Sequence, residues 1–268
     1  MEAHQRRICE IPRCARQDHR HLTRAAEALN SDPRSMIAAR SYLFNFYIAF
    51  VTGVMGLALL PALVDRRFAR AITTLWAKVV LAGLRIICGL SFRVLGEENI
   101  PRGGAVVAVN HQSMWETVAL IALLSRPAMV LKKELLRVPV YGWWAARTGV
   151  PIDRSAGAKA LRRLRRETER HIARGDQIVV FPEGTRGPPG GLGALQPGVA
   201  GMYSAAAAPV TPVVHNSGEF WLHPSGRKSP GSVTIRFLPA IPPNLPRRDF
   251  MRALEAALRQ KPAAESPP

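Results

Sequence analysis

A histidine and a carboxylic acid follow a short apolar run near the middle of the chain. His111 and Glu116 are separated by four residues. On a regular helix this spacing rotates the two side chains by about 140°, so they can meet only if His111 precedes a helix and Glu116 lies in its first turn. The carboxylate would then hold one imidazole nitrogen, and the other nitrogen would be a base for a hydroxyl.

The same segment has a second interpretation. Ser113 and Glu116 have the spacing of a helix capping box, in which the Glu116 side chain turns back to the backbone of Ser113. The two interpretations are compatible, because a carboxylate has two oxygens. The segment alone therefore leaves both open.

A second chemically suggestive segment follows another apolar run and reads Phe181-Pro-Glu-Gly-Thr-Arg-Gly187. Its glycines permit a close backbone approach, and Thr185 and Arg186 offer a hydroxyl and a forked cation suited to phosphate. A Pro- and Gly-rich turn with a surface arginine is also a common loop, so this segment by itself is weak evidence.

Two further segments are weaker still. Residues 149–154 form a short apolar run that ends in Asp153 and Arg154, which in isolation favours an ordinary surface ion pair. Residues 209–214 read simply as a strand.

The elements that must position these side chains alternate between strands and helices after Leu90. We expect strands at residues 105–109, 128–131, 149–152, 177–181, 210–214 and 233–237, and helices at residues 113–124, 134–147, 157–174 and 198–207. Such alternation predicts an α/β domain with a mixed or mostly parallel sheet flanked by helices.

Two apolar stretches precede this domain. Residues 42–64 are almost uncharged and long enough to cross a hydrocarbon core of about 30 Å. A cleaved signal peptide is disfavoured, because no small-x-small site precedes Asp65. The second stretch, residues 71–90, carries Lys78 and Arg85 on one helical face, from which both could reach lipid headgroups. We therefore expect one or two N-terminal membrane helices, either spanning or inserted into one leaflet.

These patterns give four expected regions. Residues 1–35 read as a disordered basic arm, and Met36 is an alternative translation start. Residues 36–90 form the membrane-associated segment, residues 91–240 the α/β domain, and residues 241–268 a Pro-rich linker with a basic helix over 247–260.

The net charge of +18 requires an anionic partner, which could be nucleic acid, an anionic membrane or a phosphorylated small molecule. Nucleic acid is disfavoured, because the arginines are scattered among apolar helices and no recognition motif is present. The three cysteines lack zinc-ligand spacing. We expect no metal site.

Taken in order, the four segments resemble the motif set of the glycerolipid acyltransferase family, in particular its lysophosphatidate acyltransferases. His111 and Glu116 match a histidine and an aspartate separated by four residues, so Glu116 departs from the usual aspartate by one methylene. Residues 152–154 match an isoleucine-aspartate-arginine motif, residues 181–186 match phenylalanine-proline-glutamate-glycine-threonine-arginine, and residues 209–214 match a proline-containing apolar strand. The resemblance covers about residues 80–240.

The resemblance implies the fold of glycerol-3-phosphate acyltransferase and transfer of an acyl group to the sn-2 hydroxyl of 1-acylglycerol-3-phosphate. It implies His111 as the base and Glu116 as the group that orients it. Contacts with the acceptor would come from the following residues: Lys132, Arg154, Glu183, Gly184, Thr185 and Arg186.

The implied acyl donor is acyl-CoA or acyl carrier protein, with no cofactor. The implied place is the inner membrane, on its cytoplasmic side, where the enzyme would meet anionic lipid. Two alternatives stay open: an acyltransferase of the same fold with another lysolipid acceptor, and a non-catalytic membrane-binding protein.

Overall fold

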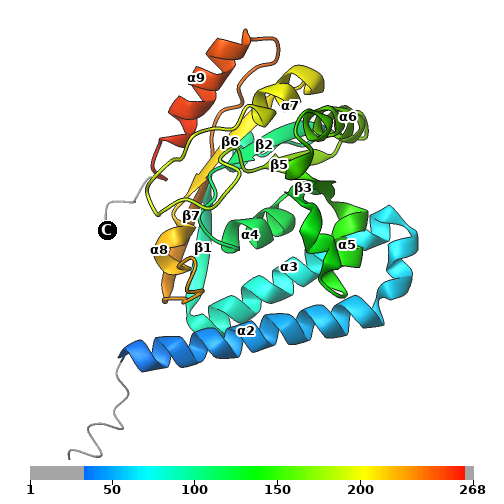
Figure 1. Cartoon of the computed structure of the whole chain (residues 1–268). Coiled ribbons are helices and arrows are strands. Elements are labelled where there is room, and N and C mark those ends of the chain that lie inside the picture. The colour runs from blue at the N-terminus through cyan, green and yellow to red at the C-terminus, as the bar shows by residue number, and fades with distance from the viewer. Residues whose placement is uncertain (1–32, 263–268) are drawn as a thin grey trace, which may run out of the picture.

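The computed structural model describes residues 33–262, which form an α/β domain with one mixed sheet of seven strands in the order β1-β7-β6-β2-β5-β3-β4 (Figure 1). All neighbouring strands are parallel except the antiparallel pair β6 and β7. The strands are β1 Leu90–Leu95, β2 Ala105–Val109, β3 Pro127–Lys132, β4 Val150–Ile152, β5 Gln177–Val180, β6 Val210–His215 and β7 Gly231–Phe237. The predicted fold class, a mixed sheet flanked by helices, is confirmed.

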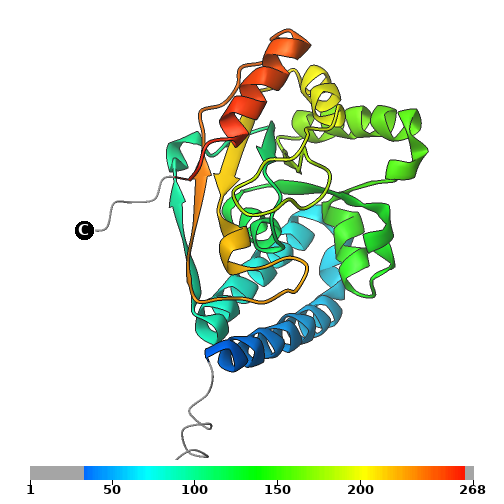
Figure 2. The same cartoon turned by 60° about the vertical axis from the view of Figure 1, so that its left-hand side comes forward.

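Helices cover both faces of this sheet. They are α2 Pro33–Ala58, α3 Arg66–Cys88, α4 Trp115–Leu123, α5 Tyr141–Thr148, α6 Ala158–Ala173, α7 Gly198–Ala206, α8 Ser217–Phe220 and α9 Arg247–Leu258, with short 3-10 turns at Leu60–Val64, Glu97–Asn99, Lys133–Arg137 and Arg154–Ala156. Helices α3 and α4 pack on one face and α6, α7 and α9 on the other, with α2 outside α3 (Figures 1 and 2).

The central strands are apolar throughout because both of their faces are covered. Every residue of β2 and β5 is buried, as expected for parallel strands between two helical layers. One core lies between the sheet and α3–α4 and includes Leu84 and Trp115. The other lies beneath α6, α7 and α9, where the rings of Tyr203 and Phe250 stack with centroids 3.8 Å apart.

The two N-terminal helices form an antiparallel hairpin, with α3 against the domain and α2 outside it. Arg34–Ala58 and Arg66–Cys88 are each long and apolar enough, by length and composition, to cross a membrane. Asp65 caps the start of α3, where its side chain accepts from the Arg67 amide, and Gly89, which has φ 66°, caps its end.

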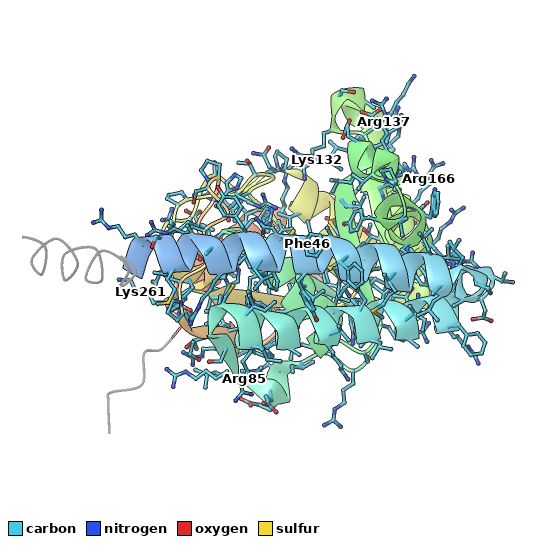
Figure 3. All side chains as sticks on the ribbon, turned by 90° about the horizontal axis from the view of Figure 1, so that it is seen from below. Phe46, Arg85, Lys132, Arg137, Arg166 and Lys261 are labelled. Atoms are coloured by element: carbon cyan, nitrogen blue, oxygen red, sulfur yellow. The ribbon has the colours of Figure 1, made fainter. Side chains whose placement is uncertain are left out.

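The outer surface of this hairpin is apolar. Figure 3 looks at α2 and α3 side by side, with Arg85 beyond one edge of the pair and Lys132, Arg137 and Arg166 beyond the other. The exposed apolar side chains of the hairpin include Tyr42, Leu43, Phe46, Phe50, Val54, Leu57, Phe68, Leu75 and Ile86. Lys78 and Arg85 are both exposed, as expected from their spacing.

Three expectations need correction. Residues 33–35 were expected in a disordered arm, but α2 begins at Pro33, and residues 1–32 lie outside the described part of the chain. The helix expected over 134–147 is broken into a 3-10 turn and α5, because Pro139 cannot continue a helix and forces its predecessor to be extended. Strand β1 was not expected, although its apolar residues alternate with polar ones.

Candidate active site

The structure brings His111 and Glu116 into contact at the carboxyl end of β2. His111 lies in the turn that follows the strand, and Glu116 lies in the first turn of α4. His111 Nδ1 is 2.7 Å from Glu116 Oε1. This is the arrangement that a separation of five positions permits, because the chain changes direction between the two residues.

The Glu116 carboxylate is completely buried, and both of its oxygens accept hydrogen bonds. Its Oε1 also accepts from the backbone amides of Gln112 and Ser113, at 2.9 and 2.8 Å. Its Oε2 accepts from the hydroxyls of Ser113 and Ser217, at 2.7 and 2.8 Å. The helix-capping contact to Ser113 and the contact to His111 therefore coexist, each using the same carboxylate.

These donors keep Glu116 ionised inside the protein. Burial acts to raise the pKa of the carboxyl group, but its hydrogen bonds with His111 and with the Ser113 hydroxyl help to outweigh burial, and the pKa is lowered to about 2. An ionised carboxylate can only accept, so His111 Nδ1 carries the hydrogen and Nε2 presents a lone pair.

The His111 ring is fixed by a stacking contact as well as by its hydrogen bond with Glu116. It stacks on Phe181 with ring centroids 4.1 Å apart, and 16% of the His111 side chain is exposed. Among residues 33–262, no group forms a hydrogen bond with His111 Nε2. A fixed imidazole with one open nitrogen is suited to remove a proton from a hydroxyl.

Glu183 connects the two predicted motifs through the backbone. Its Oε1 accepts from the His111 amide at 2.9 Å, and its Oε2 accepts from the Gly193 amide at 2.8 Å. The His111 carbonyl in turn accepts from the Gly187 amide at 2.8 Å. Glu183 was predicted to position the acceptor or its own loop, and both of its oxygens bind backbone amides that link the loop after β5 to the loop that carries His111.

Gly184 and Arg154 also meet. The Arg154 guanidinium donates to the Gly184 carbonyl, which joins the turn after β4 to the loop after β5. Gly184 has φ 73°, a conformation that glycine adopts without strain. Asp153 pairs with Lys133 at 3.4 Å rather than with Arg154, so the ion pair favoured from the sequence alone has a different cation.

The remaining predicted residues are exposed and lie apart. Arg186 Nη1 is 3.3 Å from His223 Nδ1, and Thr185 is exposed beside it. Lys132 is exposed at the end of β3 and, within residues 33–262, forms no hydrogen bond with another predicted site residue. The structure thus gathers five of the eight predicted residues into one connected unit: His111, Glu116, Glu183, Gly184 and Arg154.

A buried network behind Glu116 was missed from the sequence. His215 Nε2 donates to the Asn110 carbonyl at 2.8 Å, and its Nδ1 accepts from the Ser217 amide at 3.2 Å. Burial lowers the pKa of His215, which favours the neutral ring that this pattern requires. The available signal was the polar run after residues 210–214, since carboxyl ends of parallel strands meet at one edge of a sheet.

Within residues 33–262, no group of three or more His, Cys, Asp and Glu residues is placed to hold a metal ion. The chemistry that the observed contacts offer is that of an oriented imidazole with one open nitrogen.

Comparison with known proteins agrees with this geometry. A family model described as acyltransferase matches residues 91–216. A 1-acyl-sn-glycerol-3-phosphate acyltransferase of Pseudomonas aeruginosa is 34% identical over 208 residues, which cover 76% of this chain and 81% of the relative. An enzyme of the same name from Chlamydomonas reinhardtii is 29% identical over 87% of this chain and 69% of its own length.

The fold has also been solved in a similar protein. The crystal structure of the 1-acyl-sn-glycerophosphate acyltransferase of Thermotoga maritima superposes with a TM-score of 0.68, covering 83% of this chain and 95% of that one at 23% identity. With the sequence matches above, it follows that the chain belongs to the acyltransferase family of the 1-acyl-sn-glycerol-3-phosphate acyltransferases.

Proposed function

We propose that this enzyme transfers a fatty acyl group from an acyl thioester to the sn-2 hydroxyl of 1-acylglycerol-3-phosphate and so forms phosphatidate. The observation that carries the proposal is the 2.7 Å contact between His111 Nδ1 and the buried Glu116, which leaves Nε2 as an open base. The name of both relatives, 1-acyl-sn-glycerol-3-phosphate acyltransferase, supports the choice of acceptor.

In the proposed reaction, His111 Nε2 removes the proton from the acceptor hydroxyl as its oxygen attacks the thioester carbonyl. The new ester C–O bond forms, the C–S bond breaks, and the imidazolium returns the proton to the departing thiolate. Glu116 stabilises the imidazolium in between. No covalent enzyme intermediate is needed, because both substrates react within one complex.

The acceptor phosphate would be bound by the exposed cations at the same edge of the sheet. Arg186 and Arg154 are the main candidates, with Thr185 and Lys132 as further exposed groups. The Gly184 backbone permits a close approach. Glu183 would act by fixing the His111 loop, because its two oxygens already accept from backbone amides.

We propose that the α2–α3 hairpin holds this site at a membrane surface. Leu84 and Cys88 of α3 belong to the domain core, while the outer face of α2 is apolar and exposed. A hairpin that lies in one leaflet satisfies both facts, since crossing the bilayer would draw α3 out of its core. Anionic headgroups would meet the flanking basic residues, and the inner membrane, cytoplasmic face, is the proposed location.

The donor is proposed to be acyl-CoA or acyl carrier protein. The arginine-rich α6 lies on the sheet face opposite the hairpin (Figure 1). With α2 in a leaflet, α6 would face the aqueous phase, where it could meet an acidic carrier protein or the phosphates of CoA.

The test is an acyl-transfer assay with labelled acyl-CoA and labelled acyl carrier protein against a panel of lysolipids. We expect incorporation into lysophosphatidate, with phosphatidate as product. If only another lysolipid is acylated, that lysolipid and not lysophosphatidate is the acceptor. If folded protein acylates no lysolipid, the proposal is overturned.

A further inference from the structure

Lys228 is a buried lysine whose hydrogen-bond acceptors in residues 33–262 are neutral oxygens. Only 1% of the residue is exposed; it belongs to the loop that follows α8 and contacts α2 through Asn45. Its Nζ donates to Asn45 Oδ1 and to the Gly226 carbonyl, each at 2.7 Å. Within residues 33–262, no carboxylate lies within ion-pair distance of this ammonium group.

A buried cation of this kind is unfavourable unless something compensates it. Neutral oxygens and two aromatic rings do so in part, because Nζ lies 4.5 Å from the Trp221 ring centroid and 5.2 Å from that of Phe44. Burial lowers the pKa of Lys228 to about 8. The group is still mostly protonated at neutral pH, so a positive charge remains available for an anion.

Lys228 lines a pocket of about 210 Å³ that contains two further basic side chains, Arg186 and His223. Arg186 has His223 as its neighbour at 3.3 Å, so its partner is another nitrogen base and not an acid. In the described part of the chain, no aspartate or glutamate lines the pocket. A lysine, an arginine and a histidine therefore converge on one space without a negative charge among them.

The position of the pocket identifies which anion it would meet. Asn45 of α2 contributes to one wall, and Ser113 and Met114 of the catalytic segment contribute to another. Ser113 donates its hydroxyl to Glu116, so the pocket adjoins the base and its carboxylate. Helix α2 also carries the apolar outer face, which gives a lipid a route to this space.

We infer that this pocket binds the phosphate monoester of the acceptor lipid, with Lys228 and His223 as ligands beside Arg186. The inference rests on the proposed function and deepens it, because Lys228 and His223 lie outside the motifs that suggested the acceptor site. A monoester carries two charges and three oxygens, which suits three separate donors.

The binding test uses the full chain in detergent micelles and follows its thermal unfolding temperature as ligand is added. Four ligands separate the sources of the anion: inorganic phosphate, glycerol 3-phosphate, lysophosphatidate and uncharged monoacylglycerol. We expect saturable stabilisation by glycerol 3-phosphate, stronger stabilisation by lysophosphatidate, and none from monoacylglycerol in the same range. Equal affinity for inorganic phosphate and lysophosphatidate would overturn the assignment to a lipid.

The variants are Lys228→Met and His223→Ala, with Arg227→Ala as the matched control. Arg227 is exposed, adjacent to Lys228, and does not line the pocket. Each pocket variant loses one hydrogen-bond donor to the phosphate, so the Kd for lysophosphatidate should rise about tenfold, while the control stays within about twofold of wild type. His223 is exposed, so its variant reports on the pocket even if Lys228→Met fails to fold.

Kinetics separate this inference from the proposed function. In both pocket variants, KM for lysophosphatidate should rise while kcat changes little, whereas loss of the base would lower kcat. Unchanged affinity in His223→Ala and in folded Lys228→Met would overturn the inference even if wild type makes phosphatidate. Conversely, if wild-type protein binds lysophosphatidate through this pocket but does not acylate it, the proposed function is refuted and the inferred phosphate site still holds.

Discussion

Two histidine–carboxylate pairs among the described residues have the same spacing and nearly the same contact. His111 and Glu116 are five positions apart, and so are His171 and Asp176. In each pair the Nδ1 atom meets a fully buried carboxylate, at 2.7 Å in the first and 2.9 Å in the second. By spacing alone, the second pair matches the histidine and aspartate of the family motif better than the first.

The two carboxylates differ in their other partners. Asp176 also accepts from Arg70 at 2.7 Å and from Arg126 at 3.0 Å, so it balances cations from α3 and from the start of β3. Glu116 is surrounded by hydroxyls and backbone amides. The ion pairs of Asp176 link α3 to the start of β3. Glu116 has no such cation beside it among the described residues, so its charge acts on the His111 imidazole.

The two pairs also lie at opposite edges of the sheet. His111 follows the carboxyl end of β2, while Asp176 precedes the amino end of β5, where Gln177 is in register with Ala105. A five-residue strand separates these levels by roughly 17 Å. The His111 side chain is 16% exposed and that of His171 is 6% exposed. The comparison teaches that three features identify a catalytic base: the end of the strands at which the histidine lies, the exposure of its side chain, and the other partners of the carboxylate. The sequence spacing of the pair does not identify it.

The largest effect expected from this comparison is on the Glu116 side chain. Glu116→Gln removes the charge that stabilises the His111 imidazolium, and it presents an amide where the carboxylate accepted hydrogen bonds. We expect kcat to fall by about 10²–10⁴-fold, measured as phosphatidate formed per folded enzyme. Glu116→Asp, which restores the family's usual residue, should retain far more activity, and equal losses in the two variants would argue against a charge effect.

Asp176→Asn should act on stability instead. The change leaves Arg70 and Arg126 without their counter-charge, and we expect a loss of roughly 2–3 kcal/mol in the free energy of unfolding, with Arg126 partly solvated. Denaturant unfolding in micelles measures it. Asp249→Asn is the matched control, because its ion pair with Arg252 is exposed on α9 and should contribute little. A fall in kcat without a loss of stability would contradict the structural role.

A smaller effect should appear in the dependence of stability on pH. The folded-state pKa of Glu116 is lowered to about 2, below the ordinary value near 4.3. Its charge therefore stabilises the folded protein above about pH 4.3, and this contribution is lost as the pH falls toward 2. Asp176 also has a lowered pKa, which acts in the same direction.

Unfolding measured between about pH 5 and pH 2.5 should thus show a smaller loss of stability in Glu116→Gln than in wild type. Asp176→Asn should show the same change in slope. A slope in Glu116→Gln that equals that of wild type would mean that the carboxylate is not held ionised in the folded state.

The sequence was informative where chemistry and local pattern coincide. The α/β class, the placement of His111 and Glu116 around a helix start, and the apolar hairpin all follow from short-range patterns. Helix boundaries failed where one residue overrode the pattern, as Pro139 did in the region before α5.

What could not be predicted depends on contacts between distant segments. Ser217 reaches Glu116 across 101 positions, and Glu183 reaches the His111 amide across 72. These loops meet because β5 and β6 pair with β2 in parallel, so that the carboxyl ends of the three strands lie together. The burial of Lys228 against α2 is of the same kind, since nothing in its local sequence marks it as an interior residue.

The most direct test of the account compares His111→Ala with His171→Ala in one acyl-transfer assay, at equal amounts of folded enzyme. We predict that His111→Ala lowers phosphatidate formation by about 10²–10⁴-fold and still sediments with membranes. His171→Ala should unfold more easily but keep its activity within about threefold of wild type, since no step of the proposed reaction uses it. Near-normal turnover by His111→Ala, or equal losses in both variants, would contradict the claim that His111 is the base.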